Sequence, residues 1–279
     1  MPGLQIQLNT EFTDLNLPRF YPDSRMTKGS LLLLDFSHPD GLLTSVPGNG
    51  SLLNNIAWKN AKEIIPSGTQ TTLSSLVGNN VTDPSKGIME ITPKKGLHGI
   101  ISQVNDINSG NDFVIGIPDL IRDYIFNNIA RGFYVSIWRK ATRLSLINAS
   151  SFFTLSFNST SNYISGILEV QMLGVNLGSR HGGQNTNNQL LTFGVSAKTG
   201  TPSANFYNGF KWGSNGAYAG GEVNKSPSQI LYQIHIMDLT SAGLTYAQAD
   251  ALDLTAFNAA FGVGGRFYGD TFTAPNTLV

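Results

Sequence analysis

The apolar residues of this chain come in short runs that are separated by clusters of turn-forming residues. Between residues 31 and 100, such clusters occupy residues 38–41, 47–50 and 66–68, and each contains both Pro and Gly. Regularly spaced turns favour strands and irregular loops over long helices. The pattern therefore predicts a mostly β fold, and 279 residues are enough for one large β domain.

The charge content fits this fold and limits the partners. Charged residues make up 13% of the chain, about half the share of a typical soluble domain, so uncharged polar side chains must cover the surface. Asn and Gly suit tight turns, and Thr suits a pleated surface. The 18 basic residues equal the 18 acidic ones, so no net field attracts nucleic acid or an anionic membrane surface. We expect no nucleic-acid partner.

Three features that the sequence lacks limit the possible location and chemistry of the protein further. No apolar run approaches the ~20 residues that span a bilayer, so we expect no membrane insertion. The chain has no cysteine, which excludes disulfides, thiolate metal sites and thiol nucleophiles. Residues 1–5 show neither the basic start nor the apolar segment of a secretion signal. We therefore expect synthesis in a cytoplasm.

Residues 231–236 give the clearest strand signal in the chain. Apolar and polar side chains alternate there, with Tyr232, Ile234 and Ile236 set against Gln233 and His235. Such alternation predicts a sheet with one face in the core. It also places His235 toward solvent or an interface.

Residues 117–131 have helical periodicity instead. Pro118 suits a first helical position, Asp119 complements the helix dipole, and the apolar residues that follow recur at helical spacing. This segment predicts a short helix.

A second short helix has stronger boundary signals. Thr245 and Gln248 stand at capping-box spacing, and Gly262 occupies the position of a helix stop. Leu254, Phe257 and Phe261 share one face. We expect this face to pack on the sandwich.

The beginning of the chain differs from the rest. Residues 1–28 contain Pro2, Pro18 and Pro22 with scattered apolar residues and no clear period, which predicts an extended N-terminal arm that packs against another subunit or protein. Residues 29–279 show no fixed repeat and no convincing linker. We expect them to form a single lectin-like β-sandwich domain.

Three segments of the second half share their pattern with a known group of proteins: residues 133–143, 231–240 and 243–270. They resemble the concanavalin A-like or laminin G-like sandwich domains of structural proteins from tailed phages and prophages. The resemblance implies an all-β fold with two short helices, a concanavalin-like jelly-roll β-sandwich. It also implies location in a virion, with other virion proteins and copies of the chain itself as partners.

No catalytic signature is visible. Glycoside hydrolysis needs two carboxyl groups about 5–10 Å apart, whereas Glu90 and Glu169 each lack an acidic neighbour two residues away and are interpreted as lone solvated acids. The four histidines share no metal-ligand spacing, and the chain has no Gly-x-Ser-x-Gly elbow. We therefore predict a protein that is not an enzyme. The alternative is an active site assembled from distant segments.

An aromatic loop at residues 205–218 is the most suggestive binding feature. Its rings lie near amide side chains and comprise Phe206, Tyr207, Phe210, Trp212 and Tyr218. Ring faces beside amides are typical of sugar sites. The alternative is a hairpin in which Phe206, Phe210 and Trp212 belong to the core.

A polar loop at residues 105–112 is the candidate calcium site. Asp106, Asn108 and Asp112 supply hard oxygen ligands there, but Gly110 stands one position early for an EF-hand and Ile117 replaces the bidentate Glu. An ordinary polar turn is the alternative. We predict no other cofactor.

Taken together, these patterns favour a non-enzymatic bacteriophage virion structural protein, a component of a capsid, tail or fibre, whose sandwich makes assembly contacts. The alternative is a carbohydrate-binding receptor-recognition module of a tail fibre that binds a host surface glycan. A glycan-degrading enzyme is the third hypothesis.

Overall fold

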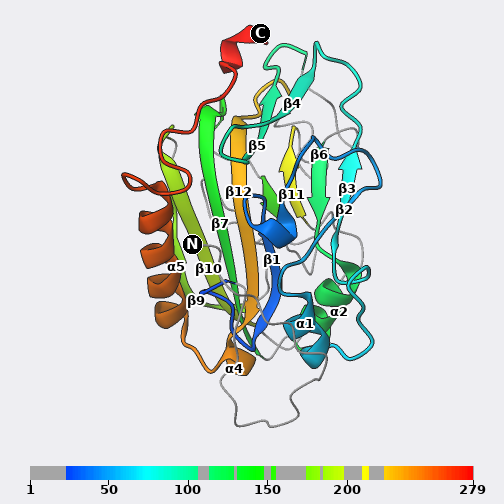
Figure 1. Ribbon diagram of the computed structural model, residues 1–279, viewed down its shortest axis with the longest axis vertical. Helices are drawn as coiled ribbons and strands as arrows, with labels where there is room; N and C mark the ends of the chain where they lie inside the picture. Colours follow the sequence, from blue (N-terminus) through cyan, green and yellow to red (C-terminus); the bar gives the residue numbers. More distant parts are fainter. Residues whose placement is uncertain are drawn as a thin grey trace, which may run out of the picture.

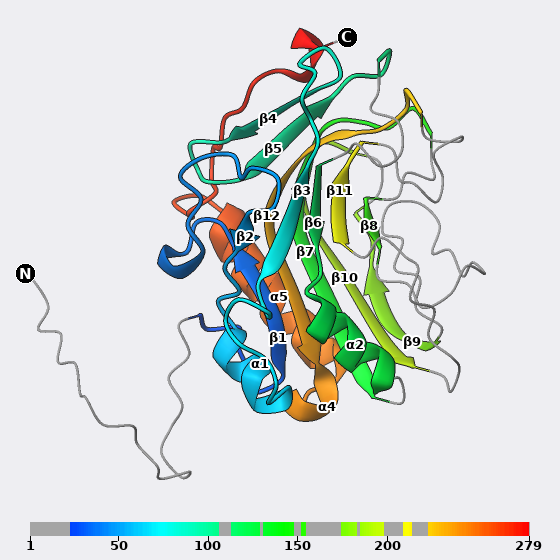
Figure 2. The same cartoon turned by 90° about the vertical axis from the view of Figure 1, so that its right-hand side faces the viewer.

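Two antiparallel β-sheets lie face to face in the computed structural model, and the longest helix covers the outer face of the larger sheet (Figures 1 and 2). The structure describes residues 23–105, 113–128, 131–147, 152–154, 174–182, 185–197, 209–213 and 223–278. The turn spacing predicted a mostly β fold, and at that level the prediction is confirmed.

The larger sheet has seven strands and contains the two longest ones. Its order is β4 (Gly87–Ile91), β5 (Leu97–Ile101), β12 (Ser228–Asp238), β7 (Gly132–Arg143), β10 (Asn188–Ala197) and β9 (Gly174–Arg180), and β1 (Ser30–Asp35) also pairs with β12. The predicted strand at residues 231–236 therefore lies in β12, which forms the central pair of this sheet with β7.

The smaller sheet has five strands. Its order is β2 (Leu52–Leu53), β3 (Ser75–Asn79), β6 (Phe113–Gly116), β11 (Gly209–Trp212) and β8 (Phe153–Thr154). The main apolar core lies between the sheets, with Phe113 and Trp212 from the smaller sheet and Leu231 from the larger one. Gly99 in β5 leaves no room for a side chain because the Trp212 ring packs directly on its backbone.

A bulge in β12 changes the alternation expected from the sequence. The register against β7 shifts between Leu231 and Gln233. As a result Ile234 and Ile236 face the core between the sheets, as predicted, whereas Tyr232 packs on the outer face of the sheet.

His235 also lies on that outer face, but it is buried. Its side chain is 1% exposed, and its Nε2 atom lies 3.0 Å from the Ser30 hydroxyl. The prediction that His235 faces solvent or an interface is wrong, because other parts of the chain cover this face. Asp253 of the long helix and Arg25 come close enough to affect the pKa of its imidazole.

Both predicted helices are present. They are α2 (Asp119–Asn127) and α5 (Tyr246–Phe261), and Thr245 and Gln248 form the expected capping box in α5. The sequence did not predict two further short helices, α1 (Trp58–Ile64) and α4 (Leu239–Ala242). In Figures 1 and 2, α1, α2 and α4 gather at one end of the sandwich.

No helix in the described ranges is long and apolar enough to cross a membrane.

Helix α5 packs on β7, β9 and β10, as expected for a helix that covers the sandwich. Phe257 and Phe261 are half-buried and join an outer cluster, defined by Trp138, Leu190, Ile230, Tyr232, Ala260 and Phe267. The ring centroids of Phe257 and Trp138 are 5.5 Å apart. The predicted apolar face therefore does contact the sandwich, at the edge of the cluster.

The described end of the predicted arm, residues 23–28, joins the sandwich. Met26 is buried beside Leu33 and Ile56, and Arg25 is 5% exposed. Residues 1–22 lie outside the described part of the chain. The expectation that the arm contacts another subunit thus remains a prediction for residues 1–22.

Candidate functional site

A C-terminal strap, residues 267–278, crosses the hairpin formed by β4 and β5 and brings polar side chains from four parts of the chain together. It begins at Phe267, which is buried in the outer cluster. It ends at Leu278, whose carbonyl accepts a 2.7 Å hydrogen bond from Arg143. Between these anchors the strap makes two carboxylate contacts with the hairpin.

The first contact is centred on His98. Its Nδ1 atom lies 2.7 Å from Glu90 Oε1, and its Nε2 atom lies 2.9 Å from the Thr142 hydroxyl. Glu90 also accepts hydrogen bonds from Thr273 of the strap, 2.8 Å from its amide and 2.6 Å from its hydroxyl. One carboxylate therefore joins the imidazole to the strap.

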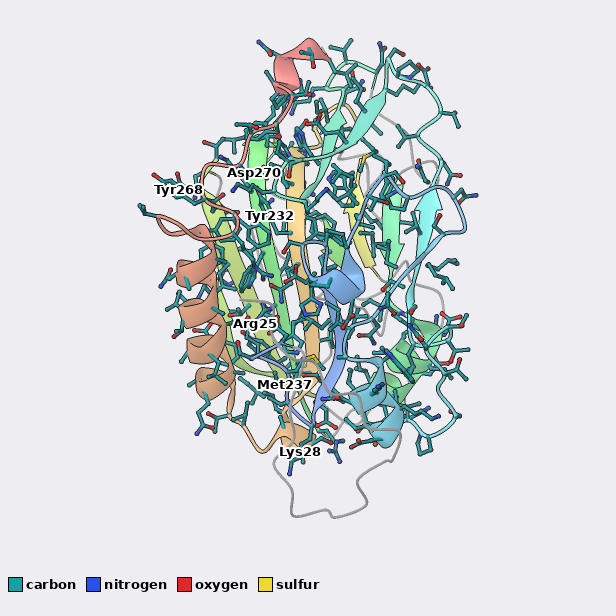
Figure 3. The ribbon with its side chains drawn as sticks, in the orientation of Figure 1. Arg25, Lys28, Tyr232, Met237, Tyr268 and Asp270 are labelled. Carbon is teal, nitrogen blue, oxygen red and sulfur yellow. The ribbon has the colours of Figure 1, made fainter. Side chains whose placement is uncertain are left out.

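The second contact is centred on Asp270. Its Oδ2 atom accepts hydrogen bonds from the hydroxyls of Thr92, at 2.6 Å, and Tyr232, at 3.0 Å. Its Oδ1 atom accepts from the Lys94 amide at 3.1 Å. In Figure 3, Asp270 and Tyr232 lie close together on the upper part of the larger sheet. Asp270 thus ties the strap to the turn of the hairpin and to β12.

Burial and hydrogen bonding set the charges here. Burial alone acts to raise the pKa of Glu90, but the hydrogen bonds from His98 and Thr273 outweigh it, and the net pKa lies below its usual value. Burial lowers the pKa of His98 below its usual value, although Glu90 and Asp270 act in the opposite sense. The stable state at neutral pH is a neutral imidazole beside an ionised carboxylate.

The order Thr142, His98, Glu90 matches the hydroxyl, imidazole and carboxylate of a nucleophilic triad. A substrate, however, could not reach the imidazole. His98 is 0% exposed, and the Phe272 ring of the strap meets its edge with centroids 5.3 Å apart. A glycosidase general acid needs a raised pKa, whereas the pKa of Glu90 is lowered. The geometry suits a latch that holds the strap.

Glu90 is therefore not the lone solvated acid that the sequence suggested. It stands directly opposite His98 in the β4–β5 ladder, and Lys95 in the intervening turn has a φ of 70°. Pairing residues equidistant from that turn was the signal that could have found the contact. Glu169 lies outside the described residues.

A second polar cluster lies beneath α5. The Arg25 guanidinium is 2.5 Å from Asp23, 3.6 Å from Asp35 and 3.8 Å from Asp253, and it lies 4.5 Å from the centroid of the Trp138 ring. Burial acts to raise the pKa of Asp23, but Arg25 lowers it more, to about 2. Figure 3 shows Arg25 between α5 and the larger sheet. The cluster fastens the N-terminal segment to the body of the protein.

The predicted sugar-binding rings are only partly described. Phe210 and Trp212 lie in β11 at 0% exposure, with ring centroids 4.7 Å apart, and the Trp212 indole donates a 2.8 Å hydrogen bond to the Gln229 carbonyl. For these two rings the sugar-binding prediction is corrected to the core alternative, because alternate side chains of β11 face the opposite sheet. Phe206, Tyr207 and Tyr218 lie outside the described residues.

The predicted calcium ligands Asp106, Asn108 and Asp112 also lie outside the described residues. Within the described ranges, no group of three or more His, Cys, Asp or Glu side chains is placed to hold a metal ion.

Comparisons with known proteins give no match to this chain, whether with family models, curated proteins or solved structures. The fold and the two polar clusters therefore define its class by themselves: an antiparallel sandwich whose terminal segments are fastened by buried ionic and hydrogen-bonded contacts. The phage resemblance stays a prediction.

Proposed function

We propose that this chain is a non-enzymatic structural protein of a bacteriophage virion, with a concanavalin-like jelly-roll sandwich, and that copies of it associate through the outer face of α5. The virion setting rests on the resemblance of residues 133–143, 231–240 and 243–270. The association rests on one observation about the surface of α5.

The exposed face of α5 carries no charge. The only charged residues of this helix are Asp250 and Asp253, and both turn toward the sheet. Asp253 is 2% exposed, and Asp250 is paired with Arg180 at 2.5 Å. A helix that stays in water normally has charged or polar residues on its outer face, and the exposed polar residues of α5 are Gln248, Thr255 and Asn258. An uncharged outer face therefore supports contact with another protein surface.

The shape of this face favours a second copy as the partner. Small exposed side chains recur every four residues, at Ala247, Ala251, Thr255 and Ala259. Such a ridge lets two equivalent helices approach closely, and a two-fold axis lets the same surface serve both partners. Leu252, which is 47% exposed, adds an apolar contact beside the ridge. The formal net charge of zero means that copies do not repel one another.

The partner is not a lipid surface in this proposal. Helices that bind anionic membranes carry Lys or Arg on their polar face, and α5 contains neither. The helix is also about 24 Å long, too short to bury by itself the ~800 Å² per partner of a stable complex. The contact is therefore expected to be weak in isolation and to be reinforced by others in an assembly.

Sedimentation velocity over a range of concentrations tests the proposal. We expect reversible self-association of the full chain, and Ala251→Glu should weaken it at least tenfold because two carboxylates would meet across the contact. Leu76→Glu is the matched control, since Leu76 is 55% exposed on the smaller sheet. A chain that stays monomeric at about 100 μM, or equal effects of the two variants, contradicts the proposed contact.

The absence of catalysis is part of the same proposal. Both carboxylates near His98 have their oxygens occupied by hydrogen bonds from the strap, the hairpin or β12, and the imidazole is fully buried. Partners in this proposal are copies of the chain and other virion proteins. Host-glycan binding was the alternative from the sequence. Two of the five rings predicted for it, Phe210 and Trp212, are buried in the core.

A further inference from the structure

Arg139 is a buried arginine on the inner face of β7. Its neighbour Trp138 points to the outer cluster beneath α5, so Arg139 points the other way, toward the smaller sheet. The side chain is 3% exposed, and the guanidinium lies 4.2 Å from the centroid of the Phe152 ring. Its charged group is thus held between the two sheets.

No carboxylate accompanies this charge among the described residues. Arg25, Arg131 and Arg180 each form an ion pair with an aspartate, whereas Arg139 makes one hydrogen bond, from Nη1 to Gln229 Oε1 at 2.9 Å. Its buried Nε atom has no hydrogen-bond partner within the ranges that the structure describes. A buried ionised group normally has a counter-charge, because desolvation is costly without one.

The contacts of Arg139 hold its free edge in a fixed orientation. Phe152 covers one face of the guanidinium, and Gln229 occupies Nη1. Gln229 is held in turn by two further hydrogen bonds. Its side-chain amide donates to the Lys211 backbone carbonyl at 3.2 Å, and its backbone carbonyl accepts from the Trp212 indole at 2.8 Å. The remaining edge, Nε with Nη2, is the one that binds a carboxylate through two parallel hydrogen bonds.

We propose that Arg139 forms an anion subsite that binds the carboxylate of a small organic acid, with Nε and Nη2 as the donors and Phe152 and Gln229 as the positioning residues. A planar carboxylate fits the fork and supplies the missing counter-charge. The near-complete burial of Arg139 limits the ligand to a small acid or to the terminal acidic residue of a sugar chain. This subsite is independent of the α5 contact and does not rest on the assembly role.

Burial agrees with this assignment. Desolvation lowers the pKa of Arg139 to about 9, so the guanidinium stays charged at pH 7 but at a cost to the folded state. A bound carboxylate would offset that cost. The buried charge therefore destabilises the ligand-free protein more than it would destabilise a complex with a carboxylate.

Thermal unfolding of the full chain at pH 7 and constant ionic strength tests the subsite. Sodium chloride is replaced stepwise by sodium acetate, sodium glucuronate or sodium phosphate, with glucose as a neutral control. We expect acetate or glucuronate to raise the Tm saturably, by ~2–4 °C at about ten times the dissociation constant or more. If glucuronate raises the Tm and acetate does not, the carboxylate that binds belongs to an acidic sugar. If acetate raises the Tm and glucuronate does not, the ligand is a small free acid.

Three variants make the result specific. Arg139→Met removes the charge at similar length and should abolish the response while keeping or raising the Tm in chloride. Arg139→Lys keeps the charge but loses the fork, and it should weaken the response at least tenfold. Arg122→Met changes an exposed ion pair and should respond as the natural chain does.

Three outcomes overturn the subsite: no response of the natural chain to either carboxylate, a response to phosphate alone, or an equal response of the Lys variant. If Arg139→Met fails to fold, the Lys variant carries the comparison.

Discussion

Replacing Glu90 with Gln should release the C-terminal strap without a large change in side-chain volume. The carboxylate accepts three hydrogen bonds, one from His98 and two from Thr273. Gln can keep the two bonds to Oε1, from His98 and from the Thr273 amide, but its Nε2 atom takes the place of Oε2 and cannot accept from the Thr273 hydroxyl. The change therefore removes one acceptor that the strap uses, together with the negative charge that strengthens the other two bonds.

The magnitude follows from the charge and the exposure of Glu90. A hydrogen bond to a charged group contributes about 1.5–3 kcal/mol when buried, and the Glu90 side chain is 27% exposed, so water replaces part of what is lost. We expect Glu90→Gln to lower the free energy of unfolding by about 1–2 kcal/mol at pH 7. Urea denaturation measures the loss, and amide exchange at Thr273 should accelerate locally.

The pH dependence gives a second check. The pKa of Glu90 is lowered in the folded state, so its stabilisation is present above the unfolded pKa, about 4.3, and is lost as the pH falls through the folded value. The difference between the two proteins should therefore shrink below about pH 4. Asp119→Asn, at an 80% exposed side chain, is the control and should cost less than ~0.5 kcal/mol. An equally small loss for Glu90→Gln, or unchanged exchange at Thr273, refutes the latch.

Three further results are expected. Phe257→Ala should cost ~1.5–3 kcal/mol in denaturant unfolding, less than the ~3–5 of a fully buried Phe because the ring is half-buried; a loss under ~1 kcal/mol means that the α5 face contributes little. Burial lowers the pKa of His235 to about 4, so its NMR signals should not titrate between pH 5 and 8, and stability should fall as the pH drops from about 6.5 to 4. Purified protein should release no fragments from host capsule, lipopolysaccharide or peptidoglycan; sustained release that Glu90→Gln abolishes would show an enzyme.

Structural features that depend only on residues close together in the sequence were predictable. The helix start at Thr245 follows from the spacing to Gln248, because both capping hydrogen bonds close within one turn. The β12 strand follows from apolar and polar residues that alternate at residues 231–236. Short apolar runs between turns were enough to predict a mostly β fold.

Other features need contacts between distant segments. Tyr232 faces the outer side of the sheet because of one bulge in β12. His235 is buried on that side because segments distant in the sequence, including Ser30 of β1, cover it. The sequence left two interpretations of Phe210 and Trp212, a sugar site or a core hairpin, until the position of β11 between β6 and β8 was known.

The sequence by itself determined the class of secondary structure, the capped helix and the shortage of charge, since each depends on composition or on local spacing. Only the tertiary structure brought Thr273 to Glu90, across 183 positions of the chain, and left Arg139 between two sheets with no carboxylate partner in the described part of the chain. Such pairings depend on strand register and on the path of the strap. Neither is encoded by any short pattern, because register is set by packing over the whole sheet.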